Sequence, residues 1–120
     1  MENLVLALKL VVALGILNVW IVRRVQPTPY RGQSAQTLRE EFTAYGLPDW
    51  VFTAVGVVKV ALAVALLSSI WVSALAKPSA LALGGIMVVA LGMHLKVRDP
   101  AIKSLPALVV LAMCLGIVWL

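Results

Sequence analysis

The chain has 120 residues, of which 62% are hydrophobic and only 12% charged, with a formal net charge of +5. Apolar residues surround every side of several long segments, whereas a soluble domain confines them to one stripe or face. This composition excludes a soluble globular domain. The basic residues stand in short loops at the ends of apolar segments, which is typical of membrane topology signals and excludes a nucleic-acid-binding face.

Four apolar segments are long enough to cross a membrane, since roughly 20 apolar residues span the ~30 Å hydrocarbon layer. We expect helices over residues 4–22, 50–73, 79–95 and 100–120. The predicted fold class is therefore all-α, a four-helix transmembrane bundle, and residues 1–120 are expected to form a single domain. At the end of the first helix, Trp20 is expected to anchor the chain at the membrane surface.

The long first loop predicts a short amphipathic helix over about residues 35–45. Ser34 can cap its start, and its apolar face includes Phe42. Gly46 stands where a left-handed residue ends a helix, which is expected to place Leu47 against Phe42. We expect this helix to lie at the membrane interface, on the mouth of the bundle.

The start of the fourth helix has two interpretations. Asp99 can cap a helix that has Pro100 at its first position, or Ser104 can cap a shorter helix that begins at Leu105. A helix from Leu105 to the end of the chain spans only ~24 Å, slightly less than the bilayer core. We therefore favour a start near Pro100.

The basic residues also predict an orientation. Residues 23–49 and 96–104 hold seven of them, namely Arg23, Arg24, Arg31, Arg39, Lys96, Arg98 and Lys103. The opposite side holds Lys77 and the contribution of Lys9. Because cytoplasmic loops carry an excess of Lys and Arg, both basic loops are expected in the cytoplasm and both termini outside a plasma or inner cell membrane.

Lys59 falls near the middle of the second helix, where a charge costs roughly 2.5 to 3.5 kcal/mol. Helical side chains point toward the N-terminus of their helix, so Lys59 reaches toward Asp49, Glu40 and Glu41. In the functional interpretation its amine binds a ligand. The alternative is that Lys59 is neutral or extends to water without a specific role.

Polar residues from other helices are expected in the same half of the bilayer. Asn18 is on the first helix and His94 at the corresponding end of the third, and Gly85 and Gly92, on the opposite side of that helix, leave open whether His94 faces inward. The candidate ligand-binding residues are Asn18, Arg31, Glu40, Glu41, Tyr45, Lys59 and His94. One histidine and one cysteine make no metal-ligand set, and no catalytic residue is predicted.

Several loop segments carry a resemblance to a known family. They are residues 28–36 (TPYRGQSAQ), 40–42 (EEF), 45–48 (YGLP), 93–97 (MHLKV) and 99–100 (DP). With these segments the chain resembles the DoxX-like family of small four-helix membrane proteins. The resemblance implies an accessory or assembly protein, because the family takes its name from a subunit associated with quinone-linked oxidoreductases. The chain departs from the family at Lys59, where relatives often carry an acidic residue.

Two functions are compatible with these features. The first is a non-catalytic accessory component of a quinone-linked redox complex, with no intrinsic cofactor beyond a bound quinone or lipid. The alternative is a small carrier for an anionic or lipid-like solute that uses Lys59. The expected partners are the lipid bilayer and either a membrane protein or a second copy of the chain. A four-helix thiol oxidoreductase is excluded, because Cys114 is the only cysteine.

Overall fold

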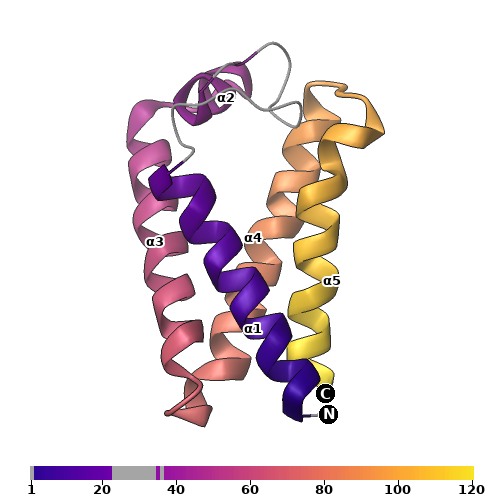
Figure 1. The fold of residues 1–120 in the computed structure, drawn as a ribbon. Coiled ribbons are helices and arrows are strands. Elements are labelled where there is room, and N and C mark those ends of the chain that lie inside the picture. Colours follow the sequence, from indigo (N-terminus) through magenta and orange to yellow (C-terminus); the bar gives the residue numbers. More distant parts are fainter. Residues whose placement is uncertain (1, 23–34, 36) are drawn as a thin grey trace.

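The computed structural model describes residues 2–22, 35 and 37–120, and these residues form helices and connecting turns without a strand (Figure 1). Four helical stretches are long and apolar enough to cross a membrane: Glu2–Ile21, Asp49–Ser68, Ser73–Lys96 and Ala101–Trp119. The predicted all-α class is confirmed. The chain is therefore a multi-pass membrane protein, because helices that are apolar on all sides need lipid around them.

The helical elements follow one another with short connections. The spanning helices are α1 (Glu2–Leu17), which continues into the π-helical turn η1 (Asn18–Val22), α3 (Asp49–Ser68), α4 (Ala76–Lys96) and α5 (Leu105–Trp119). The remaining elements are the short helix α2 (Leu38–Ala44) and the 3-10 turns η2 (Ser73–Leu75) and η3 (Ala101–Ser104).

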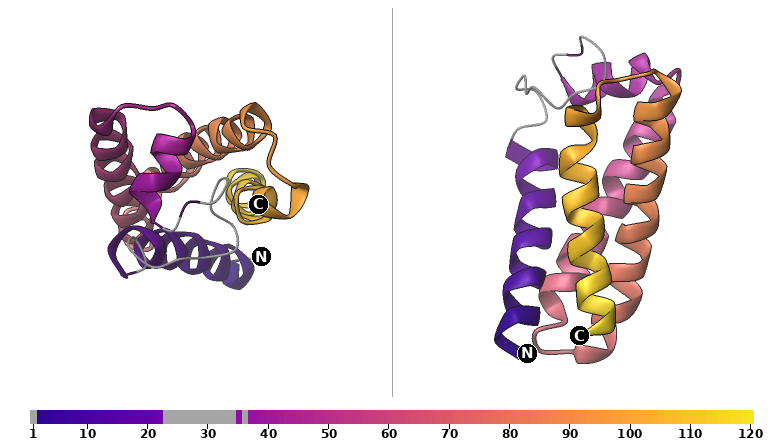
Figure 2. Two further views of the ribbon diagram at one scale, coloured as in Figure 1. Left: turned by 90° about the horizontal axis from the view of Figure 1, so that it is seen from above. Right: turned by 90° about the vertical axis from the view of Figure 1, so that its right-hand side faces the viewer.

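The spanning helices form a ring in which α1 packs on α3, α3 on α4, α4 on α5, and α5 on α1. Successive helices run in opposite directions, so both ends of the chain lie at one end of the bundle (Figure 2). α2 lies across the opposite end, beside the turn that joins α4 to α5 (Figure 1). The four-helix bundle with a short helix in its first loop is thus confirmed.

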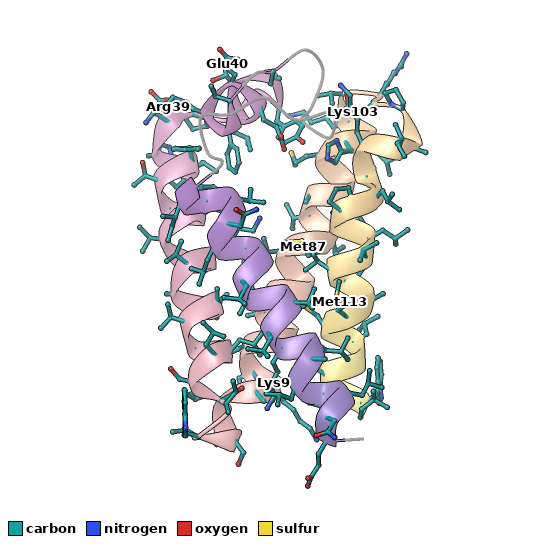
Figure 3. The ribbon with its side chains drawn as sticks, viewed as in Figure 1. Lys9, Arg39, Glu40, Met87, Lys103 and Met113 are labelled. Atoms are coloured by element: carbon teal, nitrogen blue, oxygen red, sulfur yellow. The ribbon has the colours of Figure 1, made fainter. Side chains whose placement is uncertain are left out.

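Small side chains hold the centre of the bundle together. Ala13, Ala63 and Ala80 are fully buried on three different helices, and they let neighbouring backbones approach closely. Larger residues fill the layers between them: Val12, Ile16, Leu66, Leu83, Cys114 and Ile117. Met87 of α4 is also buried and lies between the helices (Figure 3). Packing of this kind supplies the association energy inside a membrane, where lipid removes the hydrophobic drive.

Three helix boundaries differ from the expected ones. α3 ends at Ser68, because the chain turns through Ser69, whose hydroxyl donates to the carbonyl of Leu66. α4 begins at Ala76, so Pro78 lies within its first turn, where the missing N–H is tolerated. The expected start of the fourth helix near Pro100 corresponds to η3, and the α-helix itself begins at Leu105.

α2 has the end predicted from the sequence and a different start. Gly46 has a φ of +78°, and the N–H of Leu47 donates to the carbonyl of Phe42 at 3.1 Å, as in a Schellman motif. The cap at the other end is Thr37, whose hydroxyl accepts from the N–H of Glu40 at 3.1 Å. Ser34, the expected cap, lies outside the described residues.

Candidate functional site

Aromatic side chains fasten α2 to the ends of α1 and α3. The ring of Phe42 meets Trp20 and Phe52 edge to face, with centroids 5.8 Å and 5.4 Å away. The ring centroids of Trp20 and Phe52 are 5.4 Å apart. Trp20 is only 6% exposed, so it is not the surface anchor expected from its position. The reason is that α2 folds back over the end of α1 and covers the ring.

Lys59 turns toward this aromatic cluster and away from the lipid. Its amine lies 5.4 Å from the centroid of the Trp20 ring, which is cation–π geometry. Glu41 of α2 is the carboxylate whose charge acts on the amine. The side chain therefore points toward the α2 end of the bundle, the direction expected from the sequence.

Gly56 makes room for the Trp20 ring. A Cβ at this position would be 2.7 Å from Cζ3 of Trp20, closer than carbon atoms can approach. Gly56→Ala is therefore expected to lower the free energy of unfolding by about 1–2 kcal/mol, because overpacking outweighs the helix propensity that alanine adds. Gly85→Ala is the matched control, since nothing lies within 4 Å of its Cβ. Unfolding of both variants by SDS in mixed micelles measures the difference, and equal effects would contradict the contact.

A second group of side chains joins α2 to the end of α4. The Tyr45 hydroxyl donates to Oε1 of Glu41 at 2.9 Å and lies beside the His94 ring, 3.3 Å from Nε2 and 3.5 Å from Nδ1. Nδ1 of His94 lies 2.7 Å from Oδ2 of Asp99. The Lys96 amine donates to the carbonyl of Tyr45 at 3.0 Å. We call these five residues the α2–α4 polar cluster.

The backbone at the end of α4 brings Asp99 into the cluster. The N–H of Asp99 donates to the carbonyl of His94 at 2.9 Å, and Arg98 has a φ of +58°. This is the bond pattern of a Schellman motif, in which the residue at the position of Asp99 touches the one at the position of His94. That contact is usually apolar, but here it is a hydrogen bond between a carboxylate and an imidazole. A left-handed Arg98 costs roughly 1–2 kcal/mol, which the buried contact offsets.

The side chains at the centre of the cluster are withdrawn from solvent. The exposed fractions are 3% for the Asp99 side chain and 6% for that of His94, and Tyr45 is 5% exposed. Buried polar groups are costly unless hydrogen bonds satisfy them. The described contacts place a carboxylate oxygen at Nδ1 of His94 and the Tyr45 hydroxyl beside the same ring. Four titratable side chains therefore follow one another in a row.

The structure brings together three of the residues predicted to form the site, Glu41, Tyr45 and His94. His94 faces inward, which the glycines of α4 had left open. The described contact of the Lys59 amine is with the Trp20 ring, which is not part of the cluster.

The other predicted residues lie apart from the cluster. Asn18 is exposed on η1 and, within the described residues, makes no hydrogen bond with the cluster. Glu40 is exposed on the outer side of α2 (Figure 3), and Arg31 lies outside the described residues. None of the described residues form a group of three or more potential metal ligands.

The sequence did not point to Asp99 and Lys96 as site residues. Asp99 was interpreted as a helix cap and Lys96 as a topology signal. The available signal was the five-residue spacing between His94 and Asp99, which matches the two contacting positions of a Schellman motif. A glycine normally marks that motif, and Arg98 stands in its place.

A family model described as the DoxX-like family matches residues 31–117, well over half of the chain and every residue of the α2–α4 polar cluster. The chain belongs to the DoxX-like family. No curated protein and no solved structure matches it significantly. The resemblance seen in the loop segments is therefore confirmed. In this DoxX-like protein the matched region runs from the first loop through most of α5.

Proposed function

We propose that this DoxX-like protein is an accessory component of a quinone-linked membrane redox complex, and that it exchanges protons with the quinone at the α2–α4 polar cluster. The observation that carries the proposal is the hydrogen-bonded chain from Asp99 through His94 and Tyr45 to Glu41. Each of these side chains can accept and release a proton. This row of side chains ends at Glu41 of α2, and Lys59 lies on α3, which packs against α2.

A proton can pass along this row of four side chains without leaving His94 or Tyr45 charged. In the proposed relay, a proton on Asp99 moves to Nδ1 of His94. The imidazole then turns so that Nε2–H points at the Tyr45 oxygen, which lies within 3.5 Å of both ring nitrogens. The proton on Nε2 moves to that oxygen, and the Tyr45 hydroxyl proton moves to Glu41. Asp99 is again a carboxylate, Tyr45 is again a phenol, and the imidazole has exchanged one neutral tautomer for the other. Ring nitrogens that are acceptor and donor in turn make histidine suitable for such a relay.

Lys59 supplies the binding element of the proposal. Its amine can donate a hydrogen bond to a quinone oxygen, while the apolar faces of α1 and α3 accommodate the tail. Reduction of a quinone to a quinol takes two electrons and two protons. The electrons come from the partner complex in this proposal. The polar cluster passes the protons one at a time by way of Glu41, and the imidazole returns to its first tautomer between the two transfers.

The same proposal includes an orientation. The excess of Lys and Arg in residues 23–49 and 96–104 supports a cytoplasmic position for the α2 end of the bundle, with the termini outside a plasma or inner cell membrane. Protons for the relay would then come from the cytoplasm. The partner is another membrane protein or a second copy of this chain.

The experiment is purification of the full chain in mild detergent, followed by mass spectrometry of what accompanies it. We expect a quinone, a stable membrane-protein partner, or both. Lys59→Leu is expected to lower the retained quinone by about tenfold, the equivalent of one hydrogen bond to a charged group. Leu95→Ala, a change on the exposed side of α4, should leave it unchanged. If neither quinone nor partner accompanies the wild-type chain, the proposal is wrong.

A second candidate is a carrier for an anionic or lipid-like solute. The position of Lys59 favours it, because the amine lies midway along α3 and is directed at the Trp20 ring inside the bundle. In proteoliposomes, uptake of an anionic fluorescent fatty acid should then fall in Lys59→Ala. Unchanged uptake in this variant would count against a carrier and leave the accessory function as it stands.

A further inference from the structure

A groove lies at the junction of α1, α2 and α3, apart from the polar cluster. Its volume is about 520 Å³, within the usual range for small-molecule sites. Phe52, Val57, Val60 and Ala61 of α3 contribute apolar walls, and Arg39 and Thr53 contribute polar groups. The groove is thus apolar along its length and cationic where α2 crosses the bundle.

The lining residues give the groove a direction. Phe52 and Thr53 lie in one turn of α3, Gly56 and Val57 in the next, and Val60 and Ala61 in the third. From the first pair to the last the helix rises by roughly 12 Å. Arg39, on α2, lies at the end that faces the membrane surface (Figure 3). A ligand with a charged head and an apolar tail fits this order of residues.

The guanidinium of Arg39 can accept an anionic head group. It lies 4.9 Å from the Phe52 ring centroid, which fixes it over the groove. Its ion pair with Asp49 is long, at 3.4 Å, and both side chains are more than half exposed, so the pair is weak. An arginine has five N–H donors, and it binds phosphate oxygens in pairs.

We propose that this groove binds an anionic phospholipid, with its phosphate on Arg39 and one acyl chain along Val57, Val60 and Ala61. The charge of the chain supports an anionic occupant over a zwitterionic one. The net charge is +5, and Lys96, at the end of α4, and Lys103, in η3, lie at the same end of the bundle as Arg39 (Figure 3). Lys59 does not line the groove, so the phosphate site on Arg39 is distinct from the amine that the quinone proposal uses.

Trp20 makes the proposal measurable, because a brominated acyl chain quenches tryptophan fluorescence on contact. The other three tryptophans, Trp50, Trp71 and Trp119, are exposed and can be changed to Phe. The full chain with Trp20 alone is reconstituted in vesicles of phosphatidylcholine and phosphatidylglycerol, with bromine on the acyl chains of one lipid at a time. We expect an approximately fivefold preference for phosphatidylglycerol beside Trp20, the effect of about one cationic residue.

Matched variants distinguish specific lipid binding in the groove from unspecific contact with the surrounding bilayer. Arg39→Gln should abolish the preference, while Lys77→Gln, at the opposite end of the bundle, should keep it. Ala61→Phe should fill the groove and reduce quenching by both lipids, while Ala54→Phe, also exposed on α3 but outside the groove, should not. Equal quenching by the two lipids in the parent chain, or a preference that survives Arg39→Gln, would overturn the proposal.

Discussion

His94→Ala is expected to lower the free energy of unfolding by about 3 kcal/mol. The change removes the partner at 2.7 Å from a carboxylate whose side chain is 3% exposed, and breaking a buried pair of this kind costs roughly 3–5 kcal/mol. We expect the lower end of this energy range, because Asp99 has further interactions in the protein that remain in the variant. Tyr45 also loses a neighbour, so α2 should separate from the end of α4.

Reversible unfolding by SDS in mixed micelles, followed by tryptophan fluorescence, measures this loss. Leu95→Ala is the control, because Leu95 is adjacent in α4 but 78% exposed. Its effect should be within about 0.5 kcal/mol. Equal losses in the two variants would mean that the polar cluster contributes no more than an ordinary lipid-facing side chain.

Lys59→Leu is expected to raise the free energy of unfolding by about 2 kcal/mol, although it removes a residue of the site. A lysine at the centre of a spanning helix costs roughly 2.5–3.5 kcal/mol, and leucine is favourable there. The cation–π contact with Trp20 recovers about 1 kcal/mol of that cost. The difference is the free energy of unfolding that the protein loses by having a lysine instead of a leucine at this position.

The same mixed-micelle titration tests the sign of this effect. Lys77→Leu is the control, since Lys77 is exposed at the end of the bundle and should change stability little. A stabilised Lys59→Leu protein that has also lost quinone retention would show that function, not folding, maintains the lysine. A destabilised Lys59→Leu protein would show that the contact with Trp20 exceeds the cost of burying the charge.

Local patterns made most of the fold predictable. Four apolar segments of sufficient length fix the spanning helices, and Gly46 followed by Pro48 fixes the end of α2. Each of these signals lies within a few residues of the feature it specifies. The prediction for Trp20 failed because an aromatic residue at a helix end is equally compatible with a surface anchor and with burial under a neighbouring helix.

The candidate site was predictable only in part, because its contacts join residues that are far apart in the sequence. Glu41, Tyr45 and His94 could be named, but the contact between Tyr45 and His94 joins residues 49 positions apart. Asp99 enters the site through a left-handed Arg98, a conformation rare for residues other than glycine. No local pattern indicates such a turn, so only the folded chain shows which carboxylate His94 meets.

The central claim is that His94 connects Asp99 to Tyr45 beneath α2, and nitrogen NMR of the chain in lipid bilayers tests it most directly. His94 is the only histidine, so histidine labelled with ¹⁵N gives a spectrum of this one ring. We predict that Asp99→Asn shifts the Nδ1 resonance and Tyr45→Phe the Nε2 resonance, while Glu40→Gln shifts neither. A spectrum typical of a water-exposed imidazole, unchanged in all three variants, would contradict the account.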